Sequence, residues 1–269
     1  MSGSDPLVAL AALPGVAEAA AAARSAVDAV LWDRALRPRM TELAAESRLR
    51  GAWASAAIDG ADVRPETVRS GAALDDSPIG RVVAAALRTQ AETPRLTTIF
   101  ERAPMQAWAA LHAVTASGFT DQSLLGRPRS DDGPDDPLRL GQAPSAAAAI
   151  NRLESLSTLL LTPTAAPAVL LAAVAHAELL ATRPFAWGSG LVARATTRLV
   201  LSARGVDPDG VTVHEAGLLS LGRPAYAAAM RGYLTGTAQG VAEWLRFSCE
   251  AVCIGAAETR RAYEALPPV

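Results

Sequence analysis

The chain has 269 residues, of which 50% are hydrophobic, and a formal net charge of −2. This length is enough for one large domain, or for a domain with a subdomain, to bury a sizeable core. The small net charge provides no overall field that would attract nucleic acid or an anionic membrane. All 25 basic residues are arginine, which excludes a Schiff-base lysine and a phosphate-loop lysine and is typical of GC-rich, bacterial-like coding.

The first residues lack the basic segment and apolar core of a signal peptide. The longest apolar run, residues 165–177, is shorter than the ~20 residues that a membrane helix needs. We therefore expect a cytoplasmic protein with no membrane and no nucleic-acid partner. Cys249 and Cys253 share a helix face with no Cys/His pair nearby, which favours small core residues over a disulfide or a zinc site.

Helical patterns follow one another along the chain, and we predict an all-α, or mostly α, protein. The predicted helices cover residues 9–34, 38–58, 65–74, 78–92, 104–116, 144–161, 213–221, 224–234 and 240–266, with two more before and after Gly188. Several of them begin at a proline, which suits the first turn of a helix. Only Val211–Val213 reads as a short strand. His112 and His176 lie on apolar helical segments and are interpreted as core residues.

Residues 117–137 form the one clear loop, rich in Gly, Pro and Asp. The clustered aspartates Asp131, Asp132, Asp135 and Asp136 would suit a cation. The Gly and Pro breaks and the flanking arginines instead favour a solvated, mobile segment. We therefore predict no metal site in this loop.

A glycine-bearing turn, Trp187-Gly188-Ser189-Gly190, separates two helical runs, and Arg194 follows one helical turn later. A Gly-x-Gly turn that opens a helix aims unpaired backbone N–H groups at one point, which is how helix N-termini bind phosphate. Arg194 is placed to bind the same anion through its guanidinium. The alternative is a tight helix–helix corner, in which the glycines allow close packing and Arg194 forms a surface ion pair.

The segment RPFAWGSGLVAR, residues 183–194, resembles the signature of the Fic family (Fido fold), His-Pro-Phe-x-(Asp/Glu)-Gly-Asn-Gly-(Arg/Lys)-x-x-Arg. The matching positions are Pro184, Phe185, Gly188, Gly190 and Arg194. The resemblance covers roughly Leu43 to Glu258, and Trp244 to Phe247 match a pattern found late in this fold. It implies a Fic/Fido-type helical bundle, with a small β-hairpin flap built from the 117–137 loop and its flanks.

Four signature positions are substituted: Arg183 stands for the catalytic His, Trp187 for the metal-binding acid, Ser189 for the Asn and Leu191 for the first Arg. A guanidinium keeps its proton and cannot act as a base, and an indole offers no oxygen to Mg²⁺. We therefore expect no catalytic residue, no metal and no resident cofactor. Weak binding of ATP or phosphate stays open at Arg183, Gly188, Ser189, Gly190 and Arg194, against the expectation that the Trp187 ring fills the pocket.

Residues 55–60, SAAIDG, resemble the inhibitory motif (Ser/Thr)-x-x-x-Glu-(Gly/Asn) that some Fic proteins carry N-terminal to the core. There the glutamate pairs with the second signature arginine and blocks the γ-phosphate of the nucleotide. Carried over, the candidates are Ser55, Asp59 and Gly60, with Asp59 facing Arg194. The alternative is an ordinary helix end at an Asp-Gly turn. We divide the chain into an N-terminal helical region, 1–95, and a Fic-like core, 96–269.

The sequence thus predicts a Fic-fold protein that has lost adenylyl transfer and acts as a protein-binding or regulatory module with an unidentified protein partner. Dimers are common in the family, so a homodimer is an open expectation. One alternative is a Fido-fold transferase with altered chemistry, because some members without the motif His catalyse other transfers. A third interpretation is an ATP-responsive binder.

Overall fold

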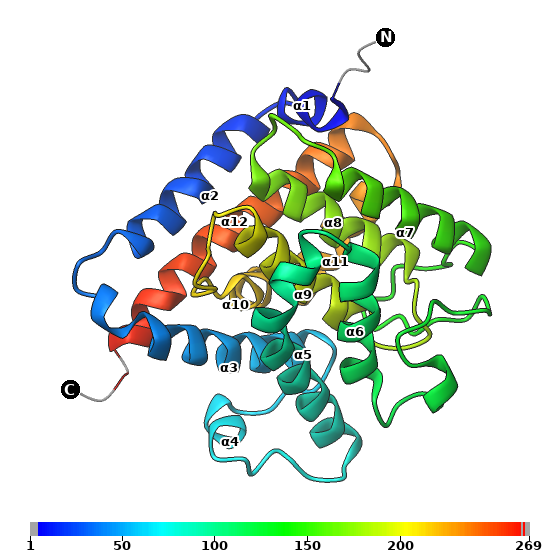
Figure 1. Cartoon of the computed structure of the whole chain (residues 1–269), viewed down its shortest axis with the longest axis horizontal. Coiled ribbons are helices and arrows are strands. Elements are labelled where there is room, and N and C mark those ends of the chain that lie inside the picture. Colours follow the sequence, from blue (N-terminus) through cyan, green and yellow to red (C-terminus); the bar gives the residue numbers. More distant parts are fainter. Residues whose placement is uncertain (1–4, 265, 267–269) are drawn as a thin grey trace.

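The computed structural model describes residues 5–264 and 266, and in this part of the chain every regular element is a helix (Figure 1). The α-helices are α1 (Pro6–Ala11), α2 (Val16–Leu31), α3 (Met40–Ile58), α4 (Pro65–Arg69), α5 (Pro78–Phe100), α6 (Pro104–Ala116), α7 (Ala146–Leu161), α8 (Ala168–Thr182), α9 (Ser189–Ala203), α10 (His214–Leu221), α11 (Arg223–Leu234) and α12 (Ala238–Glu264). Short 3₁₀ turns lie at Arg37–Arg39 and Gln122–Leu124. The all-α prediction is confirmed.

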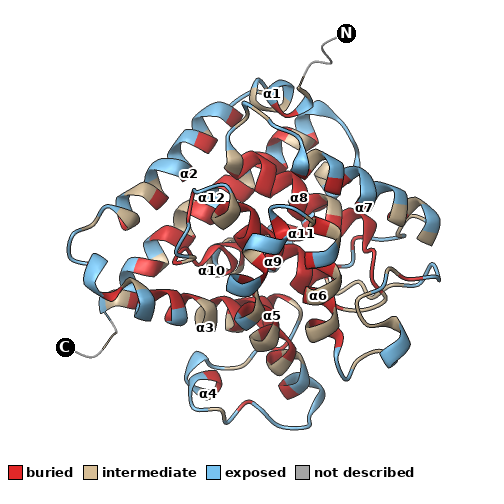
Figure 2. Ribbon diagram, viewed as in Figure 1, coloured by how far each residue is buried: buried red, intermediate tan, exposed pale blue. Residues whose placement is uncertain are grey.

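Helices α8 and α9 form the centre of the molecule. Nearly every residue of both helices is buried, including Leu170 to Ala177 and Ser189 to Leu201. A helix that is apolar on all sides, as α8 is, must be covered by other helices. They pack against each other, and α7 and α12 contact α8 while α5 contacts α9. Figure 2 shows the buried residues concentrated on these central helices, with the exposed ones on the periphery.

The N- and C-terminal helices lie together although they are far apart in sequence. Helix α2 runs beside the long helix α12, which also contacts α10 and α11 (Figure 1). Helix α3 packs between α5 and α10 and reaches the start of α9 with its C-terminal end. The predicted boundary between residues 95 and 96 falls inside α5, and the two-part division stays a prediction.

The predicted helical segment over residues 9–34 is two helices, α1 and α2. Two other helices, α4 and α5, end well away from their predicted C-terminal ends. Helix α4 stops at Arg69, before the left-handed Gly71 (φ 79°). Helix α5 continues past Glu92 through Pro94 to Phe100. Pro94 cannot donate to the carbonyl four residues earlier, but the Thr93 hydroxyl donates to that carbonyl, Gln90 O, at 2.9 Å. The side chain thus satisfies the acceptor that the proline leaves unpaired.

The expected strand at Val211–Val213 and the expected hairpin flap are both wrong for the described residues. The only β pairing between residues 5 and 264 is an isolated bridge between Ser117 and Thr120. The Asp207 carboxylate accepts hydrogen bonds from the N–H groups of Val211 (3.0 Å) and Thr212 (2.8 Å), which replaces pairing with another strand. None of the helices described has the length and apolar character to span a membrane.

Candidate functional site

The signature turn joins the two central helices through two left-handed residues. Arg183 ends α8 with φ 42°, and Gly188 precedes α9 with φ 80°. A non-glycine residue in this region is uncommon and carries a steric cost. The Ser189 hydroxyl closes the turn on itself, since it donates to Phe185 O and accepts from Phe185 N–H, both at 3.3 Å. The turn is therefore held from inside.

The aromatic residue of the signature is anchored by a buried histidine. The rings of Phe185 and His112 stack with centroids 4.1 Å apart and an interplanar angle of 9°. His112 Nδ1 accepts a hydrogen bond from Gly126 N–H at 3.0 Å. Burial lowers the pKa of His112 to about 4, against a smaller opposite effect of the Trp187 backbone. His112 is therefore neutral and packs the site from behind, as the core interpretation expects.

His176 is also a core residue. Its Nε2 lies 2.5 Å from the Tyr226 hydroxyl and its Nδ1 lies 3.1 Å from the Thr197 hydroxyl. The side chain is fully enclosed, and burial lowers its pKa well below the usual value, helped by the nearby charges of His214 and Arg194. Both ring nitrogens are thus used to connect α8, α9 and α11.

Arg194 binds the end of α3. Its Nη2 lies 2.7 Å from Asp59 Oδ2, and its Nε donates to the Ser55 hydroxyl at 2.5 Å. The Arg194 side chain is fully buried and that of Asp59 is 9% exposed. A Cβ added at Gly190 would lie 3.3 Å from Arg194 Nη1 and 3.4 Å from Asp59 Oδ1. The glycine thus leaves room for this ion pair at the start of α9.

Arg183, at the position of the motif histidine, binds the loop that precedes α7. Its Nη1 lies 2.7 Å from Asp136 Oδ2, and its Nη2 donates to Gly141 O at 2.7 Å. The Arg183 side chain is 4% exposed. Arg183 and Arg194 are therefore each paired with a separate carboxylate.

Asp135 contributes a carboxylate to the N-terminus of α9. Its Oδ2 accepts from Gly188 N–H at 3.3 Å, and its own N–H donates to Ala186 O at 3.0 Å. Helix N-termini bind phosphate and other acidic groups, and here a carboxyl group of the same chain takes that place. Burial raises the pKa of Asp135 to about 7; the charge of Asp59 acts in the same direction, and the Gly188 N–H opposes them.

Arg129 fastens the same loop to the end of α8. Its side chain is buried, its Nε donates to Arg183 O at 2.8 Å, and its Nη2 donates to Pro144 O at 2.5 Å. A guanidinium suits this place because the last carbonyl groups of a helix carry partial negative charge. Arg129, Asp135 and Asp136 together hold residues 129–141 over the turn, and we call this segment the acidic loop.

Little space is left between the acidic loop and the turn. A cavity of about 10 Å³, the room of about one water molecule, is lined by Asp59, Asp135, Asp136, Arg183 and Gly190 among others. Trp187 does not line it, contrary to the expectation that its ring fills the pocket. The Trp187 ring stacks on Phe119 with centroids 3.6 Å apart, and Leu191 is buried against α3 and α5.

The structure thus brings Asp59, Arg183 and Gly190 together around one small cavity. Arg194 and Ser55 lie beside it, bonded to each other, and Arg194 also binds Asp59. Gly188 binds Asp135, and Ser189 lies inside the turn. Gly60 ends α3 with φ 99° and does not line the cavity. The sequence interpretation missed Arg129, Asp135 and Asp136. The expected solvated segment is wrong for these three, because their side chains bind the signature turn and the chain beside it. Within the described ranges, no group of three or more Asp, Glu, His and Cys side chains is placed to hold a metal ion.

The sequence matches no protein-family profile and no curated protein. The fold is similar to several solved structures. A Fic family protein from Desulfovibrio desulfuricans G20 superposes with a TM-score of 0.73 at 19% identity, over 94% of this chain and 76% of that one. Fic-1 (aa134–508) from C. elegans gives 0.67 at 15% identity, over 93% and 72%. A Fic domain containing signaling protein from Bacteroides thetaiotaomicron VPI-5482 gives 0.64 at 12% identity, over 93% and 100%. Over most of its length, this chain has the fold of Fic family proteins.

Proposed function

We propose that this Fic-fold protein does not transfer nucleotides and acts as a protein-binding or regulatory module. The observation that carries the proposal is the position of Asp135, whose carboxylate accepts the Gly188 N–H at the start of α9. In the Fic proteins whose signature this turn resembles, this helix start is the anion hole for nucleotide phosphates. Here a carboxyl group of the same chain takes that place.

The charges around the turn support the same proposal. Arg183 is paired with Asp136, and Arg194 with Asp59. A phosphate group entering the turn would meet these carboxylates, and separating a buried pair leaves each charge without its partner. The cavity of about 10 Å³ is also far smaller than a nucleotide. Nucleotide binding would therefore require the acidic loop to leave the turn.

The residues around the turn also lack the chemical groups that nucleotide transfer needs. General-base catalysis is typically worth ~10²–10⁴ in rate, and Arg183 cannot supply it because a guanidinium does not give up its proton. His112 and His176 are both fully buried. His112 Nδ1 accepts the Gly126 N–H, and His176 Nε2 lies 2.5 Å from the Tyr226 hydroxyl, so these nitrogens are already engaged within the protein. The indole of Trp187 offers no oxygen ligand to a divalent cation.

The proposal is tested with labelled ATP, UTP and CTP in the presence of Mg²⁺ or Mn²⁺. We expect no label on the protein itself or on proteins of a lysate, and no heat of nucleotide binding by calorimetry. Labelling that disappears in a folded Arg194→Ala variant would overturn the proposal in favour of a transferase with altered chemistry. Nucleotide binding without labelling would overturn it in favour of an ATP-responsive binder.

A further inference from the structure

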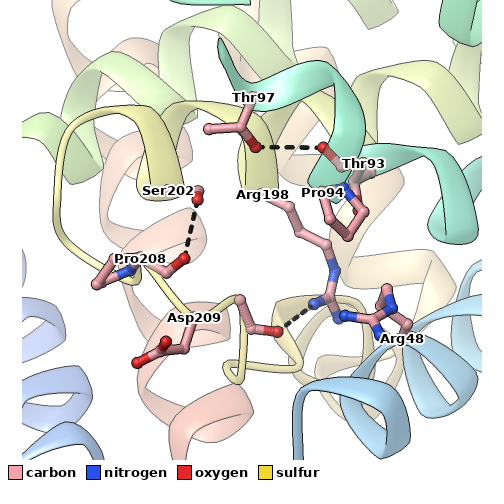
Figure 3. A pocket seen from close by; sticks show the side chains of 9 residues that line it. Arg48, Thr93, Pro94, Thr97, Arg198, Ser202, Pro208 and Asp209 are labelled. Atoms are coloured by element: carbon pink, nitrogen blue, oxygen red, sulfur yellow. Dashed lines mark hydrogen bonds between the residues drawn. The ribbon is translucent and has the colours of Figure 1, made fainter. Parts of the chain in front are cut away.

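Two arginines, Arg48 and Arg198, line a second cavity, away from the signature turn. It has a volume of about 70 Å³ and lies between α3, α5, α9 and the loop after α9 (Figure 3). Arg48 comes from α3, Thr97 from α5, and Arg198 and Ser202 from α9. Gly210 and Asp209 belong to the loop. Arg198 lies one helical turn beyond Arg194, so α9 carries both the signature arginine and this one.

Arg198 lies in the wall of this cavity and is held in place by hydrogen bonds. Its Nε and Nη2 bind the two carboxylate oxygens of Glu215 at 2.7 and 2.8 Å. Its Nη1 donates to the Ser47 hydroxyl at 2.9 Å and to Gly210 O at 3.1 Å, and its Nη2 also donates to Ser47 O at 3.2 Å. These bonds use all five N–H donors of the guanidinium. Arg198 therefore contributes no free donor to the cavity, and Glu215 balances its charge.

The guanidinium of Arg48, in contrast to that of Arg198, has free N–H donors. Its guanidinium lies beside that of Arg198 (Figure 3), and it makes no hydrogen bond or ion pair with any residue that the structure describes. The side chain is half-buried, and burial lowers the pKa of Arg48, as does the charge of Arg198. The Glu215 carboxylate balances the charge of Arg198, whereas no carboxylate of the described residues pairs with Arg48, so the uncompensated charge in this half-closed space is that of Arg48.

The other polar groups of the cavity are compatible with an anion. The carboxylate of Asp209 is exposed and points away from Arg48 (Figure 3). The hydroxyls of Thr97 and Ser202 donate to Thr93 O and Pro208 O over 3.2 and 3.3 Å. Both distances exceed about 3.0 Å, where the usual range of O–H···O bonds ends, so both bonds are weak and either hydroxyl can turn to donate to an anion at small cost.

We propose that this cavity binds a small oxyanion of the phosphate class, held by the guanidinium of Arg48, which has no carboxylate partner among the described residues. A guanidinium fork matches the oxygens of a phosphate group in geometry and charge. The cavity has room for a few water molecules or one such group, and is too small for a nucleoside. The ligand is therefore inorganic phosphate, or the phosphate group of a larger molecule whose remainder lies outside the cavity.

Calorimetry and thermal unfolding of the full chain test this site, with inorganic phosphate as the probe and chloride at matched ionic strength as the blank. Phosphate at tenfold its dissociation constant should raise Tm by about 3 °C. In Arg48→Gln, phosphate affinity should fall at least tenfold. Arg102→Gln is the matched control, because Arg102 is exposed between α5 and α6, and its side chain makes no hydrogen bond or ion pair with the residues described. It should bind phosphate as the wild type does.

The source of the anion is tested with phenyl phosphate. Equal affinity for phenyl phosphate and inorganic phosphate supports a phosphate group on a larger molecule, and binding of inorganic phosphate alone supports the free ion. Absence of phosphate binding to the wild type would overturn the proposal. An equal loss of affinity in Arg48→Gln and Arg102→Gln would also overturn it, because the binding would then follow general surface charge. None of these outcomes depends on the acidic loop or on nucleotide transfer.

Discussion

Nη2 of Arg194 lies 2.7 Å from Oδ2 of Asp59, although the two residues are 135 positions apart in the sequence. This contact joins the C-terminal end of α3 to the start of α9. Burial opposes the charge of Arg194, but Asp59 outweighs it and raises the pKa of the guanidinium. The pair lies where the resemblance places an inhibitory acid and the second signature arginine.

We expect this pair to stabilise the fold as a unit. Asp59→Ala and Arg194→Ala should each lower the free energy of unfolding by roughly 3–5 kcal/mol, because each leaves a buried charge unpaired. The double variant should lose less than the sum of the two. Chemical denaturation of the four proteins measures this coupling. The exposed pair Arg24–Asp28, with exposed fractions of 48% and 34%, is the matched control, for which about 0–1 kcal/mol is expected. Strictly additive losses at Asp59 and Arg194 would contradict the prediction.

The carboxylate of Asp135 should make stability depend on pH near neutrality. Its pKa is raised to about 7, above its value in the unfolded chain. The stability linked to the protonated form is therefore fully present below about pH 4 and is lost as the pH rises through 7. Asp135→Asn stays neutral and should be the more stable protein at pH 8, by up to roughly 2–4 kcal/mol. Urea denaturation at pH 5 and pH 8 measures the difference, with Asp121→Asn on the exposed surface as control. Identical pH profiles for the wild type and Asp135→Asn would rule out this role.

Glu215 should make the protein less stable as the pH falls into the acid range, whereas Asp135 makes it less stable as the pH rises. Burial disfavours its charge, but Arg198 and His214 outweigh burial and lower the pKa of Glu215 to about 2. The stability linked to the ionised form is present above about pH 4.5 and is lost as the pH falls towards 2. Glu215→Gln should lower the free energy of unfolding by roughly 3–5 kcal/mol at pH 7. At pH 3 the difference between the variant and the wild type should be smaller. Glu92→Gln, from the outer pair with Arg95, is the control. A cost that does not change between pH 7 and pH 3 would show that the lost contact is not ionic.

The acidic loop should prevent the restored signature from binding nucleotide. Arg183→His, Trp187→Asp and Ser189→Asn together return the base, the metal ligand and the amide of the signature. We expect this triple variant to show no heat of ATP–Mg²⁺ binding, because Asp135 still accepts the Gly188 N–H. Adding Asp135→Ala and Asp136→Ala should produce measurable binding by calorimetry. A folded five-residue variant without affinity would mean that other parts of the turn have lost the shape of a nucleotide site.

Much of the fold could be predicted from local signals. Pro65, Pro78 and Pro104 each mark the first turn of a helix, because a helix start needs no N–H from its first residues. The extension of α5 through Pro94 could not be predicted in this way. It depends on the Thr93 hydroxyl replacing one backbone donor, and a proline inside a helical pattern more often ends the helix.

The site was predictable only where the sequence carries a motif. The spacing from Gly188 to Arg194 and the order of Asp59 before Arg194 indicated which residues to compare. The acidic loop carried no such signal, since aspartates among Gly and Pro usually face solvent. Their partners, Arg183 and Gly188, are about 50 residues further along the chain. Two features of the sequence could have indicated the contact between the loop and the turn. Arg and Asp alternate in the loop, and an arginine stands at the motif position.

The Asp135 carboxylate differs from a dissolved ligand in one further respect. A nucleotide occupies its site in proportion to its concentration in the cell, whereas a tethered group stays close by at an effective concentration on the order of millimolar. Any free phosphate compound must exceed that level, or bind much more tightly, to replace it. The start of α9 should therefore remain filled when cellular nucleotide levels rise or fall. A molecule that opens it would have to act on the loop itself, for example by binding the Arg129 side of the segment.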